Sequence, residues 1–306
     1  MQPPPRHECL VIGAGPAGLT AATCLARFRR RVLVVDGGAS RASRIPVSRD
    51  LPGFPDGVPG PDMLDRMRAQ ALRYGARIVP GHVERLDRLP GGGFAATLGG
   101  RPIEAECVLM ATGVLDVEPA LPGIPDAVRR GLVRYCPACD AHEMAGQKVA
   151  LIAYGTCRVE PALLLGAYAA DLTVLTLGRG LHISPEERAK LAEAGIRIVD
   201  DPVAEVAVEG DKIVAWHMRG GGTHGFDAVY TALGMTVRSG LATALGAEAD
   251  ADGALIVRDH QKTNVPGLYA AGDVVRGLPL VAVAVAQAAV AATDMHRRLP
   301  LPRPGR

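Results

Sequence analysis

The chain has 306 residues, of which 48% are hydrophobic, so it is long enough for two domains and apolar enough to bury a full core. Its formal net charge of +2 gives no electrostatic reason to expect a nucleic-acid partner. Residues 1–6 are polar and proline-rich, so we expect no signal peptide, and the longest apolar run, 280–292, is too short to cross a bilayer. We therefore expect a cytoplasmic protein with no membrane partner.

The predicted elements begin with a strand over 8–13, a helix over 16–27 and a second strand over 31–36. The first turn contains Gly13-Ala14-Gly15-Pro16-Ala17-Gly18, in the strand–turn–helix context of a dinucleotide-binding loop. In such loops the first glycine makes the turn, the second lets a pyrophosphate approach, and the third lets the helix pack on the strand. Asp36 ends the second strand, where a carboxylate can bind a ribose hydroxyl.

The same order of elements occurs twice along the chain. In the first unit a helix over 61–74, a strand over 77–79, a β meander and a strand over 105–111 follow. The second unit places its strands and helices at 148–153, 158–170, 172–177, 185–194, 196–199 and 226–232. Alternating strands and helices predict parallel sheets with right-handed crossovers, and a duplicated unit of this length indicates two nucleotide-binding domains.

The segment after Gly240 fits neither unit and is expected to return to the first domain. It has an apolar strand over 267–271, then Gly272-Asp273, then the apolar helix over 280–292. We predict an α/β fold with two Rossmann-like, three-layer ββα domains, of which the first is discontinuous. The expected bounds are 1–115 with 241–306 for the first domain and 116–240 for the second.

A Cys-x-x-Cys pair, Cys136-Pro137-Ala138-Cys139, lies in the second unit. Proline suits the first helical position, so Cys136 is expected at the N-cap and Cys139 in the first turn, where free amides and the helix dipole favour a thiolate. A zinc half-site would need two more ligands and no second Cys-x-x-Cys exists, so we expect no metal. A structural disulfide is rare in intracellular chains, and the nucleotide-binding context favours a redox pair.

Two side chains near this pair are candidates for proton transfer. Asp140, directly after Cys139, can move a proton between the dithiol and disulfide states. His142, a turn further along, is a second candidate base, and a histidine that faces solvent is the alternative that we leave open.

The second copy of the glycine motif is eroded. Ala153-Tyr154-Gly155-Thr156-Cys157-Arg158 keeps only the middle glycine, so a Cβ stands at the tight turn and a long cation stands where helix meets strand. No acid ends the next strand, and Arg179 alone is thin support for a ribose 2′-phosphate. These features indicate a kept fold with a damaged nicotinamide site, so NAD(P)H is a doubtful cofactor. A contact of Arg158 with a phosphate is the alternative.

Together these elements resemble the low-molecular-weight thioredoxin reductase family over nearly the whole chain, from Glu8 to about Arg298. The motifs that carry the resemblance are 13–18, 111–113, 136–140 and 270–273. The resemblance implies FAD in the first domain, a redox disulfide in the second and a homodimer. It also implies that Cys139 faces the flavin, that Cys136 exchanges with the partner disulfide, and that Asp140 is the acid/base.

The FAD site that the resemblance implies lies mainly in the first domain. Gly272 and Asp273 would hold the ribityl and phosphate region, and Leu280 and Val281 would offer backbone amides to the flavin pyrimidine edge. Arg44 follows Asp36 in a loop, where contact with the pyrophosphate and a solvated position are both open. The expected set is Gly13, Gly15, Pro16, Ala17, Gly18, Asp36, Gly37, Arg44, Asp50, Thr112, Gly113, Gly272, Asp273, Leu280 and Val281.

The chain also departs from the family. The family usually has Arg-Gln-Ala in place of Leu280-Val281-Ala282, often has Asn in place of Asp50, and carries a basic His-Arg-Arg stretch that is absent here after Leu177. Cys-Pro-x-Cys, with Glu143 shortly after, is more similar to the dithiol-oxidase and pyridine-nucleotide-independent branches.

We therefore expect an FAD-dependent dithiol/disulfide oxidoreductase that passes two electrons between flavin and the Cys136–Cys139 pair without ordinary use of NADPH. Its expected partner is a small dithiol or disulfide, or a thioredoxin-like protein. An NADPH-dependent thioredoxin-disulfide reductase and a non-enzymatic flavin redox sensor are the alternatives.

Overall fold

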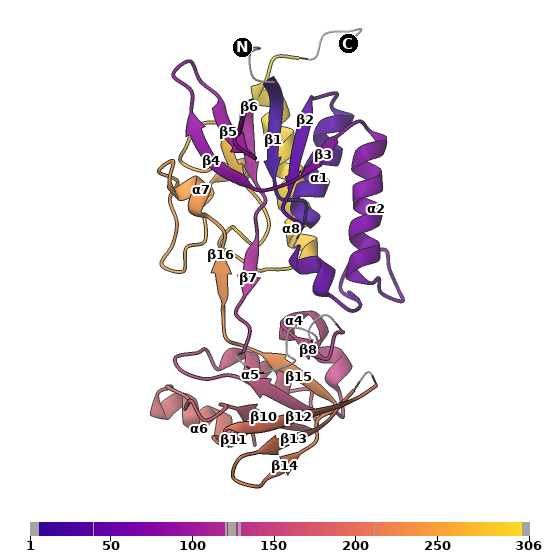
Figure 1. Cartoon of the computed structure of the whole chain (residues 1–306), viewed down its shortest axis with the longest axis vertical. Helices are drawn as coiled ribbons and strands as arrows, with labels where there is room; N and C mark the ends of the chain where they lie inside the picture. Colours follow the sequence, from indigo (N-terminus) through magenta and orange to yellow (C-terminus); the bar gives the residue numbers. More distant parts are fainter. Residues whose placement is uncertain are drawn as a thin grey trace.

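The structure is a computed structural model that describes residues 6–38, 40–119, 121, 127, 130–210 and 212–301. Two lobes lie at opposite ends of an elongated molecule, and the upper lobe contains both the first described strand and the last described helix (Figure 1). Each lobe contains a parallel sheet covered by helices on one face and by antiparallel strands on the other, which confirms the predicted pair of three-layer domains.

The sheet of the upper lobe has the order β3-β2-β1-β6-β5-β4, with β17 also paired to β6. Its strands are β1 (Arg6–Ile12), β2 (Val32–Asp36), β3 (Arg77–Pro80), β4 (Val83–Arg88), β5 (Phe94–Leu98), β6 (Arg101–Met110) and β17 (Leu268–Ala270). The helices α1 (Pro16–Arg27), α2 (Gly60–Arg73) and α8 (Val281–Arg298) belong to this lobe. Side chains along β1 alternate between two buried clusters, because successive residues of a strand point to opposite faces.

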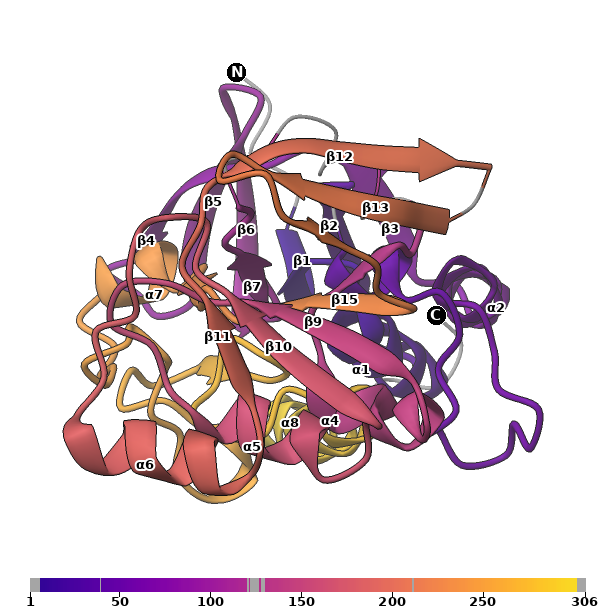
Figure 2. The same cartoon turned by 90° about the horizontal axis from the view of Figure 1, so that it is seen from below.

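The sheet of the lower lobe is parallel, in the order β11-β10-β9-β15-β8. Its strands are β8 (Val133–Arg134), β9 (Lys148–Ile152), β10 (Asp171–Leu175), β11 (Arg197–Val199) and β15 (Ala228–Thr231). The helices α5 (Glu160–Gly166) and α6 (Pro185–Glu193) lie on one side of it, and β12 (Val203–Glu209), β13 (Lys212–Met218) and β14 (Thr223–His224) lie on the other (Figure 2).

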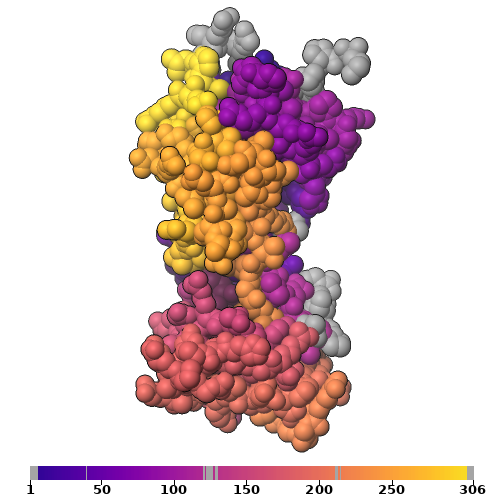
Figure 3. Space-filling view, turned by 90° about the vertical axis from the view of Figure 1, so that its left-hand side faces the viewer, coloured from indigo at the N-terminus to yellow at the C-terminus, as the bar shows by residue number. Residues whose placement is uncertain are grey.

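Two short strands join the lobes. β7 (Val114–Asp116) leaves the upper lobe and pairs antiparallel with β16 (Met235–Val237), which returns to it before α7 (Gly240–Thr243). The space-filling view shows the two lobes meeting over a narrower middle (Figure 3). The late strand β17 pairs with β6, as expected for a tail that returns to the first sheet, while the domain bounds at 115 and 240 stay a prediction. Within the described residues, no helix has the length and apolar character needed to cross a membrane.

Two helices differ from their predicted bounds. The helix predicted over 158–170 is shorter, because Pro161 fits only the first turn of a helix and residues 156–159 form a loop before it. The helix predicted over 280–292 continues to Arg298, since no breaker follows until Pro300 and the added turn is amphipathic rather than apolar.

Candidate active site

A cavity lies where the two lobes meet, with a volume of about 1300 Å³ that includes space open to solvent. The upper lobe contributes the first glycine loop, residues 36–50, residues 111–114 and the start of α8, and the lower lobe contributes Arg134, Tyr135, Cys136, Cys139 and Asp140. The predicted nucleotide loop and the predicted redox pair therefore line one cavity, although more than 100 residues separate them in sequence.

The glycine loop has the geometry that its three glycines predict. Gly13 has a positive φ of 112°, and a Cβ there would overlap the carbonyl oxygen of Ala111 on the next strand. A Cβ on Gly18 would overlap the carbonyl oxygen of Gly13, so this glycine lets α1 pack on the turn. Gly15 is looser, because its Cβ would lie 3.2 Å from the Ser40 hydroxyl at the cavity wall.

The residues present fit a flavin dinucleotide. Within the described chain no side chain caps α1 and no acid lies in its first turn, so its amides are open to a phosphate. Asp36 ends β2 at the cavity, where it accepts a hydrogen bond from the Gly38 amide and pairs with Arg68. At the far end of the cavity, Leu280 caps the 18-residue helix α8 and contributes to the lining with Val281.

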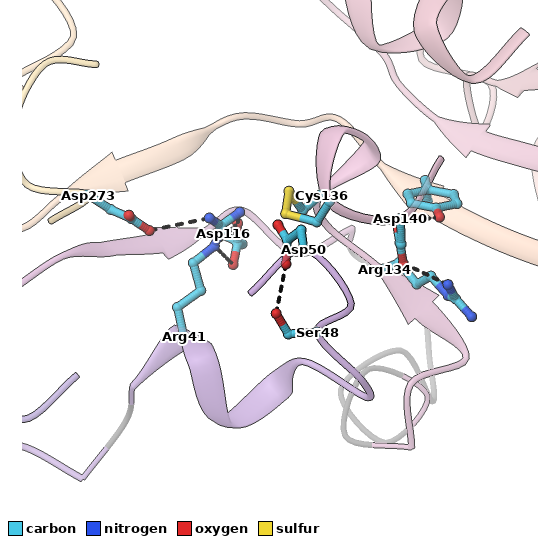
Figure 4. The surroundings of a disulfide bond; sticks show 10 residues. Arg41, Ser48, Asp50, Asp116, Arg134, Cys136, Asp140 and Asp273 are labelled. Carbon is cyan, nitrogen blue, oxygen red and sulfur yellow. Dashed lines mark hydrogen bonds and ion pairs between the residues drawn. A yellow bond between two sulfur atoms is a disulfide. The ribbon is translucent and has the colours of Figure 1, made fainter. Parts of the chain in front are cut away.

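Cys136 and Cys139 form a disulfide. Cys136 occupies the N-cap of the short helix α4 (Pro137–Asp140), Pro137 takes its first turn, and the Cys139 amide donates to the Cys136 carbonyl at 3.1 Å, as predicted from the proline. A turn of 3-10 helix follows and ends near Gly146, whose φ is +75°. The disulfide lies between Asp50 on the side of the upper lobe and Asp140 on the other side (Figure 4).

Asp140 is held by two donors from other strands of its lobe. Arg134 on β8 donates from Nη1 to Oδ2 at 2.6 Å, and the hydroxyl of Tyr230 on β15 donates to Oδ1 at 2.6 Å. Burial raises the pKa of Tyr230, and the negative charge of Asp140 raises it further, so this phenol stays neutral and keeps its proton to donate. The carboxyl side chain of Asp140 is 17% exposed.

A loop of the upper lobe, residues 41–50, forms the wall between the glycine motif and the disulfide. Arg41 donates to Asp116 at 2.8 Å and to Asp273 at 3.3 Å, and so ties β7 to the loop after β17. Burial raises the pKa of Asp273, although Arg41 acts against that shift. Arg44 lines the cavity but pairs with Glu118 at 3.0 Å, and Ser48 donates to Asp50 at 2.7 Å.

The structure brings most of the predicted site residues together, with two exceptions. His142 is exposed and does not line the cavity, because the turn after α4 directs it away; of its two readings, the solvent-facing one describes its position. Gly18 lies behind the lining, where it acts through packing. Arg134, Tyr230 and Asp116 were missed by sequence reasoning, because no motif links them to the cysteines and only strand pairing brings them close.

The second glycine loop is closed by its own chain. The Gly155 amide donates to the Gly180 carbonyl at 2.9 Å, and the Gly155 carbonyl accepts from the His182 amide at 2.8 Å. The Arg179 guanidinium lies 4.7 Å from the centre of the Tyr154 ring. The amide and the carbonyl of Gly155, the one glycine kept in this motif, are thus both hydrogen-bonded to the loop that follows β10. A nucleotide site would need that amide to be free to bind a phosphate.

A double Rossmann-like fold with a disulfide that lines the cavity beside the glycine loop of the other domain is typical of flavin-dependent disulfide oxidoreductases. The family model for pyridine nucleotide-disulphide oxidoreductases matches residues 7–288, and the chain belongs to this family. The chain is accordingly a flavin-dependent disulfide oxidoreductase of the thioredoxin reductase-like kind.

Individual relatives agree with this assignment. The thioredoxin reductase of Streptomyces coelicolor is 32% identical, with 88% of this chain and 86% of that protein covered. A bifunctional thioredoxin reductase/thioredoxin of Mycobacterium leprae is 31% identical over 96% of this chain, which spans 66% of the length of that relative.

Solved structures give the same fold. HlmI superposes with a TM-score of 0.87 at 30% identity, covering 95% of this chain and 92% of HlmI. The thioredoxin reductase of Streptococcus pyogenes gives 0.86 at 26% identity, covering 95% and 97%. The atypical thioredoxin reductase TRi of Desulfovibrio vulgaris gives only 0.53 at 31% identity, covering 94% and 96%.

Proposed function

We propose that the protein passes two electrons between FAD and the Cys136–Cys139 pair, exchanging them with a dithiol or disulfide partner and not using NADPH in the ordinary way. The observation that carries the proposal is the pairing of an open first glycine loop, with the disulfide beside it, and a second glycine loop closed by Gly180 and His182. FAD, when bound, supplies the two-electron acceptor or donor. The residues proposed to hold it are those predicted from the sequence that line the cavity.

The chain's own residues perform the thiol chemistry. A substrate thiolate attacks Cys136, the bond to Cys139 breaks, and the electron pair stays on the Cys139 sulfur. Asp140 accepts the proton of the incoming thiol and can return it to a cysteine. One substrate dithiol is oxidised to a disulfide while the enzyme disulfide is reduced to two thiols, and the reverse order reduces a disulfide.

An anaerobic reductant screen on the FAD-loaded protein tests this proposal. Dithiothreitol should bleach the flavin, while NADPH at micromolar concentration should leave it yellow. Cys136→Ser should abolish the bleaching by dithiol and leave the bound flavin in place. Rapid bleaching by low NADPH would contradict the nicotinamide-independent reading, and a flavin that no dithiol reduces would contradict the proposal as a whole.

A second candidate, an NADPH-dependent thioredoxin-disulfide reductase, is favoured by the relatives that carry that name. It requires the loop after β10 to release Gly155 when a nucleotide binds. Steady oxidation of NADPH in the presence of thioredoxin, lost in Cys136→Ser, would establish it in place of the first.

We also propose a partner, an oligomeric state and a cellular location for the enzyme. The partner is a small dithiol or disulfide, or a thioredoxin-like protein, and the functional form is a homodimer, which sedimentation of the FAD-loaded protein can check. Cys9, Cys24, Cys107 and Cys157 are free thiols, as in the reducing cytoplasm where we place the protein.

A further inference from the structure

The Asp140 carboxylate accepts a hydrogen bond from the buried Tyr230, and the packing of the fold does not require the Tyr230 hydroxyl. Tyr230 is fully buried in β15, and its hydroxyl reaches out of an apolar cluster to the Asp140 carboxylate. In the first half of the duplicated chain the matching strand position, Leu109, is apolar and equally buried. A phenylalanine would fill the core of the second half equally well, so packing does not account for the hydroxyl.

Arg134 adds a second constraint from the neighbouring strand, where it is the register partner of Tyr230. It projects from β8, the strand that leads into Tyr135 and Cys136, and its guanidinium binds the other carboxylate oxygen (Figure 4). Each oxygen of Asp140 thus has one lone pair engaged by a fixed donor from a separate strand. The remaining lone pairs stay available on the cavity side, where Asp140 and Cys139 both contribute to the lining.

We propose that Arg134 and Tyr230 are positioning residues that hold the Asp140 carboxylate in the orientation needed to take the proton of an incoming thiol at the Cys136–Cys139 disulfide. This inference rests on the proposed function, because Asp140 is the proton acceptor there. The two donors do not touch the reacting sulfurs. They keep the carboxylate from rotating away, so that it can accept the proton while the substrate sulfur attacks the disulfide.

Asp140 takes part in both thiol steps that reduce the disulfide. The first substrate thiol gives its proton to Asp140, its sulfur bonds to Cys136, and Cys139 leaves with the electron pair and takes the proton back. The second substrate thiol repeats the transfer, its sulfur attacks the mixed disulfide, and Cys136 leaves as a thiol. A loosened Asp140 slows both transfers, so the Cys136–Cys139 disulfide should persist longer before it is reduced to two thiols.

A double-mutant cycle on the FAD-loaded protein tests the inference. Tyr230→Phe should lower the limiting rate at which anaerobic dithiothreitol opens the disulfide by about tenfold, with little change in its dependence on dithiothreitol concentration. Asp140→Asn should lower it by about a hundredfold. In the Asp140→Asn background, Tyr230→Phe should cause no further loss, because the hydroxyl acts only through the carboxylate.

The readout is independent of flavin colour. Samples quenched with iodoacetamide and weighed by mass spectrometry report the disulfide, the dithiol and the mixed disulfide directly. Arg134→Lys, which keeps the charge but loses the planar fork, should also slow the loss of the disulfide. Tyr269→Phe is the matched control, since Tyr269 is 1% exposed and donates to Asp294 at 2.8 Å, and neither residue lines the cavity; its rates should equal those of the wild type.

The possible results separate the two proposals. Equal losses from Tyr230→Phe with and without Asp140, or no loss from either Tyr230→Phe or Arg134→Lys, would overturn the positioning role while the redox function stands. If dithiothreitol opens the disulfide but the flavin stays oxidised, the proposed electron transfer to the flavin is wrong. The positioning role of Arg134 and Tyr230 can still be tested from the alkylation pattern.

Discussion

At the scale of single residues, two glycines of the first glycine loop have different roles: one allows close packing, and the other lets a ligand approach the backbone. Gly18 lies against the backbone of Gly13, which cannot move without breaking the turn, whereas Gly15 meets only the flexible Ser40 side chain. The same substitution should therefore have different consequences at two positions only three residues apart. One glycine supports the fold, and the other keeps the cavity open to a phosphate.

Gly18→Ala should destabilise the protein by about 2 kcal/mol or more, because the added methyl group overpacks a rigid contact. Gly15→Ala should cost under about 1 kcal/mol yet weaken FAD binding. Urea unfolding of the apo forms, together with flavin titration, measures both effects. Equal stability of the two variants would show that the overlap expected at Gly18 is relieved by a backbone shift.

At the scale of elements, the end of α8 is fastened to the first sheet by one buried arginine. The Arg30 side chain is fully buried, and it donates to Glu8 at 2.9 Å and to the His296 ring at 3.0 Å. It also donates to the carbonyl oxygens of His296, Leu299 and Pro300 at 2.8, 3.2 and 2.6 Å. These carbonyls end α8 and have no further turn to accept from, so Arg30 takes the place of a C-cap.

Arg30→Met should lower the free energy of unfolding by about 3 kcal/mol, since it leaves Glu8 and several carbonyl groups without their donor. The neighbouring Arg31 is a matched control, because it lies 3.7 Å from the same carboxylate but is 68% exposed. Arg31→Met should cost under about 0.5 kcal/mol. Urea denaturation at pH 7 compares the two, and similar losses would mean that the carbonyl contacts contribute little.

This cluster should also make the protein acid-sensitive. Burial lowers the pKa of His296, and the Arg30 and Arg297 charges lower it further, so the folded state prefers the neutral ring. Burial raises the pKa of Glu8, but the Arg31 amide and the Arg30 side chain outweigh it and the net shift is downward.

Both groups have a lower pKa when folded than when unfolded, so their stabilisation is present at neutral pH. It should be lost as the pH falls below about 6.5 through the histidine range and then through the glutamate range. The stability gap between the wild type and Arg30→Met should therefore narrow between pH 7 and pH 4. A gap that stays constant in urea titrations across this range would contradict the assignment.

At the scale of the whole molecule, the loop over 41–50 holds the two lobes in one relative arrangement. Besides the Arg41–Asp116 and Arg44–Glu118 pairs, Arg49 lies 3.9 Å from Glu143 beyond the disulfide. Only Asp116, at 4% exposed, is shielded from solvent. HlmI and TRi have nearly equal identity to this chain, but their TM-scores of 0.87 and 0.53 show that the whole-chain structure of HlmI is much more similar to it.

We expect this protein to keep one arrangement in both redox states, because its disulfide already lines the cavity proposed to hold FAD. Solution scattering of the oxidised and dithiol-reduced protein should give superimposable profiles. Asp116→Asn, which removes the shielded charge, should broaden the distribution of lobe orientations, while Glu118→Gln should not. A change in profile on reduction of the wild type would show that the lobes rotate.

The sequence by itself determined the local chemistry of this protein: the duplicated strand–helix order, the glycine turn, and the cysteine pair at a helix start. These depend on periodicity, on the φ that glycine permits and on the missing amide of proline, all of which act within a few residues. Only the tertiary structure decided which side chains support the disulfide. Tyr230 reaches Asp140 across 90 positions of chain, and Arg41 reaches Asp116 across 75, because strand pairing and lobe contact set those distances. The closure of the second glycine loop belongs to the same class, since the hydrogen bonds of Gly155 come from a loop beyond the next strand.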